Sequence, residues 1–430
     1  MLPSPDSLQI ILLVTSILFL LLSFKRSVYG VIAYFIILNA KLGDMYPALG
    51  AIRFELIAAA IVLTTIFISG RGITAALPAA STLNKPLWIL FIVAMLSIPV
   101  AISPAVSWEN GGYFLLKLVL FYVMLVGSVK TKEDIHKLIW AFVLMAAWTA
   151  YEPVFNYVRG EVREHVYGAV AFGRFGAAVG HVALSNTLNQ ALPITLFWAM
   201  SEKAKQKRYL LLACVLLMVV GVVLSKSRGG FLGLIMAFCG LACMSQKKGK
   251  SILIGMVVLL VLVGVAGQGY FEHMSTMQDG ITGGRSMNDR YMGLMNGIVM
   301  MLRRPLLGVG IGCYAEARSQ YFGYYFYSHN LYGELLGELG LASAAWFFWI
   351  YVVYRKAGVL QRRLRGDPVT VRYANLLRGV QLGLLLRLFI GNFTHSAFIW
   401  FWFFNAGLVV ALEYVMKKDE NTNRALRTVH

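Results

Sequence analysis

One histidine in the sequence lies where a proton acceptor for a membrane-surface reaction would be expected. His329 is in segment 327–332, where a long polar loop meets an apolar stretch. At the N-terminus of a helix the backbone dipole disfavours imidazolium, so a neutral ring there could accept a proton from an attacking hydroxyl group. A single histidine at an interface is also often only a hydrogen-bonded structural residue. Neighbouring side chains must decide between these two interpretations.

Three arginines outside the predicted membrane helices could bind phosphate. Arg174 lies in segment 173–176, Arg228 follows Ser227 at the turn between two apolar stretches, and Arg290 opens a short amphipathic segment. A guanidinium near a membrane is costly unless it is paired or lines a wet cavity, and its planar fork fits phosphate oxygens. Three such groups on one side of the membrane would suit a lipid diphosphate. Each could instead extend to lipid headgroups.

Two acids and several further histidines are weaker candidates. Glu334 and Glu338 lie one helical turn apart in an apolar stretch, so they must face protein or water, either to orient groups in a site or to pair with bases. His395 follows a short turn and could reach the same cavity as His329. The remaining histidines of the same side, which have no comparable surroundings, are His165, His181 and His273.

Several motifs of soluble nucleotide and hydrolase chemistry are missing. The sequence has no Asp-x-Asp pair, Walker loop, His-Glu-x-x-His or Gly-x-Ser-x-Gly. The glycine-rich run 308–312 follows an amphipathic segment rather than a strand, which argues against dinucleotide binding. We therefore expect neither a metal nor a cofactor.

The elements that must position these residues are membrane helices. Of the 430 residues, 58% are hydrophobic and 14% are charged, and the mean hydropathy is +0.68. A helix needs about 20 mostly apolar residues to cross a bilayer. The first apolar run lacks the basic region of a cleaved signal peptide and is expected to be retained. The predicted spans are 8–24, 27–41, 53–69, 86–103, 112–129, 136–156, 184–200, 208–224, 230–245, 251–267, 330–354, 374–391 and 396–416.

This pattern predicts an all-α polytopic integral membrane protein with about twelve to thirteen transmembrane helices, forming a single transmembrane domain over residues 1–430. The net charge of +19 is concentrated in alternate loops, which indicates topology rather than nucleic-acid binding. By the positive-inside rule, the basic loop 355–373 and the tail 417–430 are cytoplasmic. Loops 157–183 and 268–329 then face the periplasm, and the second contains a short amphipathic helix along the membrane interface. The four cysteines predict no structural disulfide.

The order of these segments resembles the bacterial O-antigen ligase and polymerase superfamily. The resemblance covers roughly residues 170–350. It rests on a helix-opening Arg290, a Pro-Leu-Leu-Gly-x-Gly turn at 305–310, and His329-Asn330 entering a span that contains Gly340. Further matching elements are Ser227-Arg228-Gly229-Gly230 and the pair Asn189 and Pro193. Two departures, which concern the subfamily, are Leu294 where many members carry Trp and Ser343 where the ligase motif prefers Gly, Thr or Tyr.

Membership would imply a GT-C-type glycosyltransferase in the bacterial inner membrane, with a large periplasmic loop of amphipathic helices and an active site facing the periplasm. It would transfer glycan en bloc from undecaprenyl diphosphate to a lipid A-core acceptor, with inversion and without metal. His329 would be the base, and Arg228 and Arg290 would bind the leaving diphosphate. The predicted substrate-binding residues are Arg174, Arg285, Asn330 and Glu334.

Two groups of alternatives remain. Within the superfamily, the acceptor could be a second repeat unit, as in an O-antigen polymerase, or a protein hydroxyl, as in an O-oligosaccharyltransferase. Outside it, arginines and acids in spans also mark transport paths, so a lipid-linked glycan flippase or a small-anion transporter is possible. Against transport, the sequence has no duplicated halves, and its polar residues cluster on one side rather than at the midplane.

Overall fold

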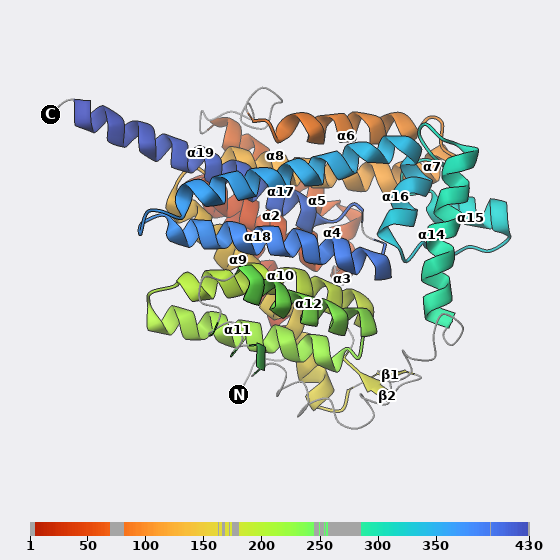
Figure 1. Cartoon of the computed structure of the whole chain (residues 1–430), viewed down its shortest axis with the longest axis horizontal. Helices are drawn as coiled ribbons and strands as arrows, with labels where there is room; N and C mark the ends of the chain where they lie inside the picture. The colour runs from red at the N-terminus through yellow and green to blue at the C-terminus, as the bar shows by residue number, and fades with distance from the viewer. Residues whose placement is uncertain are drawn as a thin grey trace.

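The protein is a bundle of long apolar helices (Figure 1). The structure is a computed structural model and describes residues 5–68, 81–161, 163–165, 168–171, 173, 180–244, 249, 253, 255–256, 285–395 and 397–428. In this part of the chain the strands are β1 (Arg163–His165) and β2 (Gly168–Val170), which pair antiparallel. They lie in the predicted loop 157–183, away from the helix core.

The predicted spans correspond closely to helices. The span 251–267 falls almost entirely outside the described residues. The other spans match α1 (Pro5–Leu22), α2 (Ser27–Ala40), α5 (Phe54–Ile68), α6 (Asn84–Ser97), α8 (Tyr113–Ser128), α9 (Lys132–Val158), α10 (His181–Ser201), α11 (Lys205–Leu224), α12 (Arg228–Met244), α16 (Leu331–Leu339) with α17 (Ala344–Leu364), α18 (Val371–Ile390) and α19 (Trp400–Thr428).

Among the described residues, five continuous helical stretches are long and apolar enough to cross a bilayer, and five more apolar helices are shorter. The prediction of an all-α multi-pass membrane protein is confirmed. The count of twelve to thirteen crossings stays a prediction.

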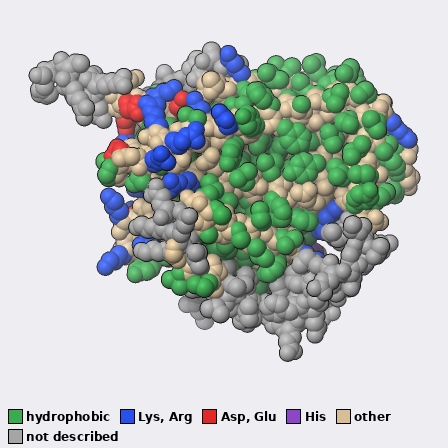
Figure 2. All heavy atoms as spheres, viewed as in Figure 1, with side chains coloured by type: hydrophobic (Ala, Val, Ile, Leu, Met, Phe, Trp, Pro, Cys, Tyr) green, Lys and Arg blue, Asp and Glu red, His purple; other side chains and the backbone are tan. Residues whose placement is uncertain are grey.

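Apolar side chains form both the core and much of the outer surface. Helix α2 is almost entirely buried, and the ring of Phe35 packs against Phe121, Trp400 and Phe404 at centroid separations of 5.1–5.8 Å. On the outside, hydrophobic side chains spread across the face drawn in Figure 2. Leu96 and Phe348, for example, are more than half exposed. Such a surface is stable only against lipid.

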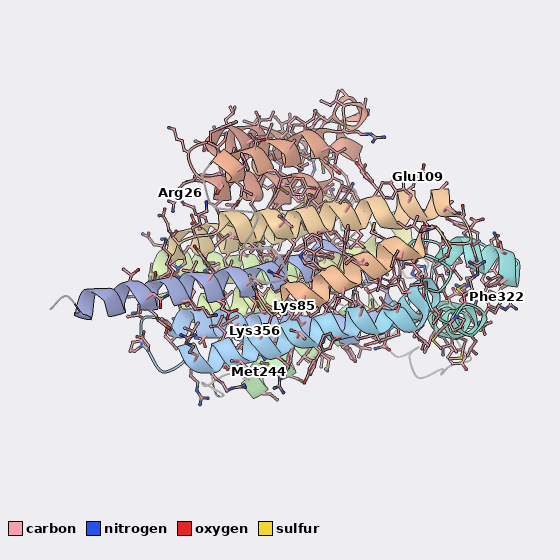
Figure 3. The ribbon with its side chains drawn as sticks, turned by 90° about the horizontal axis from the view of Figure 1, so that it is seen from above. Arg26, Lys85, Glu109, Met244, Phe322 and Lys356 are labelled. Atoms are coloured by element: carbon pink, nitrogen blue, oxygen red, sulfur yellow. The ribbon has the colours of Figure 1, made fainter. Side chains whose placement is uncertain are left out.

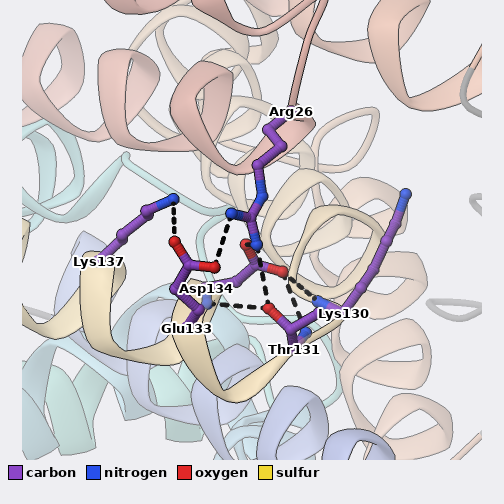
Figure 4. A network of polar contacts seen from close by, with 6 residues as sticks. All are labelled: Arg26, Lys130, Thr131, Glu133, Asp134 and Lys137. Carbon is purple, nitrogen blue, oxygen red and sulfur yellow. Dashed lines mark hydrogen bonds and ion pairs between the residues drawn. The ribbon is translucent and has the colours of Figure 1, made fainter.

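The basic loops lie at one end of the bundle, where acids from different elements bond to their Lys and Arg side chains. Arg26, between α1 and α2, bonds to Glu133 at 2.8 Å and to Asp134 at 2.9 Å (Figure 4). Thr131 and Asp134 also form a capping box that starts α9. Two further pairs at this basic end are Lys132–Asp419 at 2.7 Å and Arg372–Glu202 at 3.3 Å.

The opposite end carries α14 (Arg285–Arg303) and α15 (Tyr314–Phe322) (Figure 1). Figure 3 shows Phe322 and Glu109 at this end and Arg26 at the other. The predicted amphipathic helix is therefore present, as part of α14. Its glycine face packs on α16: a Cβ at Gly297 would lie 2.2 Å from the backbone oxygen of Gly333. The two backbones touch only because no side chain separates them.

The glycine-rich turn that follows α14 is joined to the end of α16 by backbone hydrogen bonds. Val309 N–H donates to Gly337 O at 2.9 Å, and Gly310 N–H donates to Glu338 O at 3.1 Å. Gly310 adopts φ 98°, a left-handed conformation that favours glycine. The turn thus fixes the C-terminal end of α16 rather than cradling a nucleotide.

Candidate functional site

A cavity of about 990 Å³ lies at the α14 end of the bundle. Helices α10, α12, α14, α16 and α18 surround it, together with the loop before α19. Four predicted site residues line it: His329, Arg228, Arg290 and Glu334. The structure therefore brings together residues that are more than 100 positions apart in the sequence. We call this space the His329 cavity.

The His329 ring is held by aromatic neighbours and is kept neutral. Its centroid lies 4.9 Å from that of Phe326 and 5.0 Å from that of His395. Burial lowers the pKa of His329 below its usual value, the charge of Arg290 lowers it further, and Asp289 partly opposes this. The ring is therefore largely unprotonated at neutral pH and can accept a proton. Desolvation is the main cause of the shift, rather than a helix dipole.

The residue after His329 fixes its position. Asn330 is the N-cap of α16: its side-chain oxygen accepts hydrogen bonds from the N–H groups of Tyr332 and Gly333, both at 3.0 Å. Its Nδ2 group donates to Asn392 O at 3.5 Å, and the residue is buried without lining the cavity. The predicted substrate-binding role of Asn330 has no support from this geometry. Its side chain orders the backbone that carries His329.

Two arginines lie on the cavity wall from different helices. Arg228 is the first residue of α12, and Arg290 lies in the second turn of α14. Arg290 Nε donates to Phe393 O at 3.3 Å, and its guanidinium carbon lies 5.6 Å from the centre of the Phe393 ring. Burial, followed by the charge of Arg228, lowers the pKa of Arg290, although a guanidinium stays charged at neutral pH. The two guanidinium groups therefore add positive charge to one wall of the cavity.

The turn before α12 is built for close packing. The Ser227 hydroxyl accepts from Gly230 N–H at 3.2 Å, and Asn189 Nδ2 donates to Gly230 O at 2.7 Å. A Cβ at Gly230 would lie 2.5 Å from the Ser185 side chain. The Ser-Arg-Gly-Gly segment therefore fixes Arg228 at the edge of α10.

The comparison with known protein families agrees with this architecture. Residues 213–351 match the family model described as O-antigen ligase. This match covers about a third of the chain and supports membership of the O-antigen ligase superfamily. The matched segment includes Arg228, Arg290 and His329, and thus much of the cavity wall. No curated protein matches the chain closely enough to be compared with it.

One ionisable residue of the cavity was not predicted from the sequence as part of the site. Arg387 of α18 is buried, lies close enough to Glu334 to attract it, and lines the cavity. Glu334 Oε2 also accepts from Ala397 N–H at 2.9 Å. The signal for Arg387 was available, because a cation within a predicted span rarely faces lipid.

His395 reaches the same cavity, as its position after a short turn suggested. Its ring stacks on Tyr327 with centroids 5.2 Å apart and an interplanar angle of 14°. Burial, then His329 and Arg387, lower the pKa of His395 to about 4. It is therefore also neutral, but it is more deeply enclosed than His329.

Helix α10 adds two amide side chains that face the cavity. Asn186 and Gln190 lie one turn apart and are each 2% exposed. Both amide atoms of Asn186 and the Oε1 atom of Gln190 have no hydrogen-bond partner in the described part of the chain. Buried amides are stable when they are paired, and sugar hydroxyls donate as well as accept.

The backbone around the cavity is strained. Four described non-glycine residues have left-handed φ angles, and three of them line the cavity: Lys41 at 51°, Lys226 at 50° and His329 at 48°. Such conformations cost about 1–3 kcal/mol each and concentrate at functional sites.

Two predicted binding residues lie wholly or partly outside the described part of the chain. Arg174 lies outside the described residues. Arg285 begins α14, but its side chain is not among those described. Their roles stay predictions.

Proposed function

We propose that the protein is an O-antigen ligase-type glycosyltransferase. In this proposal it transfers glycan en bloc from undecaprenyl diphosphate to a lipid A-core acceptor on the periplasmic side of the bacterial inner membrane. The superfamily match supports the class of reaction. The observation that carries the proposal is one cavity in which a neutral His329 faces the same space as Arg228 and Arg290.

In the proposed reaction, each of these residues has one role. The acceptor hydroxyl gives its proton to His329 as its oxygen attacks the anomeric carbon of the donor sugar. The bond between that carbon and the diphosphate oxygen breaks, and the electron pair leaves with undecaprenyl diphosphate. Attack from the face opposite the leaving group inverts the anomeric configuration. Arg228 and Arg290 stabilise the negative charge that grows on the diphosphate, as a metal ion does in other enzymes.

The size of the cavity supports a long donor that is only partly enclosed. Pockets of up to about 1,000 Å³ enclose a drug-sized ligand, which corresponds to the diphosphate and the nearest sugars. The lipid chain and the rest of the glycan must extend beyond it. Asn186 and Gln190 offer unpaired amides to the sugar hydroxyl groups.

The proposed orientation rests on charge. The basic end, which contains Arg26, Lys132 and Arg372, lies opposite the His329 cavity. Because basic ends face the cytoplasm, the cavity opens toward the periplasm.

The test uses purified wild-type protein, a lipid-linked glycan donor and deep-rough lipopolysaccharide as acceptor, in the presence of EDTA and without nucleotide. Transfer shifts the acceptor to higher mass on a gel. If donor binds but no acceptor is glycosylated, the ligase assignment fails. If a second lipid-linked repeat unit accepts the glycan instead, the protein is a polymerase.

A further inference from the structure

A second cavity lies at the basic end of the bundle, far from the reaction site. Its volume is about 560 Å³. On α18, Arg372 lines this cavity and Arg387 lines the His329 cavity, so about 22 Å of helix separates them. We call it the basic-end cavity. Its walls come from α1, α2, α9, α11 and α18, and from the turn after α10.

The charged groups of the basic-end cavity leave positive charge without a counterion. Its described charged residues are Lys137, Lys207, Arg372, Glu133 and Glu202. Both acids already have protein partners. Glu133 bonds to Lys137 and to Arg26, both at 2.8 Å (Figure 4). Glu202 bonds to Arg372 at 3.3 Å.

One cation of the cavity remains without an ion pair in the described part of the chain, and Arg372 adds a second positive charge beside its bond to Glu202. Lys207 has no ion pair among the described residues, and Arg372 Nε is buried there without a hydrogen-bond partner. The Arg372 guanidinium is also held in place, because its central carbon lies 4.3 Å from the centre of the Trp198 ring. A fixed guanidinium and an ammonium group without an ion pair, both lining one cavity, are suited to a phosphate.

The remaining wall of the cavity is apolar and continues toward the lipid. Phe19, Ile32, Trp140 and Leu144 line it, and Leu144 is 51% exposed on the outer surface. On α9, Leu144 lies about 10 Å further from the basic end than Lys137 does. The cavity therefore has a cationic end and an apolar wall that runs toward the middle of the bundle. A free phosphate would use only the first of these features.

We propose that the basic-end cavity binds an anionic phospholipid from the membrane leaflet that surrounds the basic end of the bundle. The phosphate lies between Lys207 and Arg372, and an acyl chain runs along Trp140 and Leu144. Basic pockets between transmembrane helices on the cytoplasmic side bind such headgroups. The bound lipid joins α1 and α2 to α11 and α18. The proposal does not depend on the reaction at His329.

The experiment uses the full-length protein in phosphatidylcholine vesicles. Phosphatidylglycerol with brominated acyl chains is added in steps, and tryptophan fluorescence is recorded. The difference between wild type and Trp140→Phe isolates the quenching of Trp140. We expect Trp140 to be quenched at a lower mole fraction of brominated phosphatidylglycerol than of brominated phosphatidylcholine.

Lys207→Gln removes one cation from the cavity. Since one basic residue near an anionic surface contributes about 1 kcal/mol, this change should raise the mole fraction for half-quenching about fivefold. Lys205→Gln is the matched control, because Lys205 is exposed on the same helix but does not line the cavity. It should shift the curve much less.

Three results would overturn the proposal. Equal quenching by the two lipids means that the groove does not select for charge. Equal shifts for Lys207→Gln and Lys205→Gln mean that the lipid only accumulates at a basic surface. Full reversal of the quenching by millimolar inorganic phosphate means that the site binds a free anion. If Trp140→Phe does not fold, the total quenching of wild type and the two lysine variants still decides between these outcomes.

Discussion

Replacing Asn330 by alanine separates two roles of this residue, a helix cap and a substrate ligand. In the structure Asn330 accepts two backbone N–H groups at 3.0 Å. Loss of an N-cap costs about 1 kcal/mol, and leaving a buried donor unpaired costs about 1–3 kcal/mol. Because Gly333 is buried and Tyr332 is half-buried, we expect Asn330→Ala to lower stability by about 2 kcal/mol.

The variant should also be slow, because the cap fixes the strained backbone of His329. A displacement of about 1 Å in a reacting group can cost about 100-fold in rate. We expect kcat to fall at least about tenfold, while the Kd for the lipid-linked donor changes little. The assays are thermal unfolding in detergent, donor binding, and transfer at saturating donor and acceptor.

Two further variants complete this test. Asn330→Asp keeps an acceptor for both N–H groups, so its Tm should stay close to wild type. Its negative charge next to His329 should raise the pKa of the histidine and move the acid limb of the rate profile to higher pH. Asn392→Ala, at an exposed neighbouring residue, is the control. If Asn330→Ala keeps the wild-type Tm but binds donor ten times more weakly, Asn330 is a substrate ligand and our reasoning is wrong.

Three other predictions follow from the site. Arg290→Lys and Arg228→Lys should each weaken donor binding about 10- to 100-fold, because a charge-assisted hydrogen bond contributes about 1.5–3 kcal/mol; an unchanged Kd in both, measured with labelled donor, would contradict the phosphate assignment. The pKa of His329 lies below its usual value, so kcat should be constant near pH 7 and fall only as the pH drops through that pKa; a rate that rises on acidification would exclude a neutral base. Gly293→Ala places a Cβ 1.8 Å from Ser328 O, so it should destabilise the protein by about 1–3 kcal/mol or more and slow transfer, as seen in Tm and kcat; wild-type values for both would show that α14 and α16 are not in close contact.

The sequence predicted the helices well, because a span of apolar residues is a local signal. The ends of α2, α5 and α8 lie within two residues of the predicted spans. It also indicated four cavity residues, Arg228, Arg290, His329 and Glu334, through their chemistry, their order and the family resemblance. These polar residues lie at or near the ends of apolar segments, and a polar side chain in such a place indicates a functional role.

Other features depend on contacts that the sequence does not specify. Asn186, Gln190 and Arg387 meet in one cavity only because α10 packs along α18, and no local pattern predicts that pairing. Asn330 is different, since an asparagine directly before a helix is a known N-cap signal. The sequence therefore contained an N-cap signal at Asn330. We predicted a binding role instead, because Asn330 directly follows His329.

The most direct test of the account is the rate of glycan transfer by His329→Ala under saturating donor and acceptor, with His395→Ala as the matched control in the same cavity. We predict that His329→Ala binds donor normally and transfers glycan about 100- to 10,000-fold more slowly, whereas His395→Ala loses much less. If the wild type transfers glycan and His329→Ala remains within about tenfold of it, His329 is not the base and the proposed mechanism is wrong.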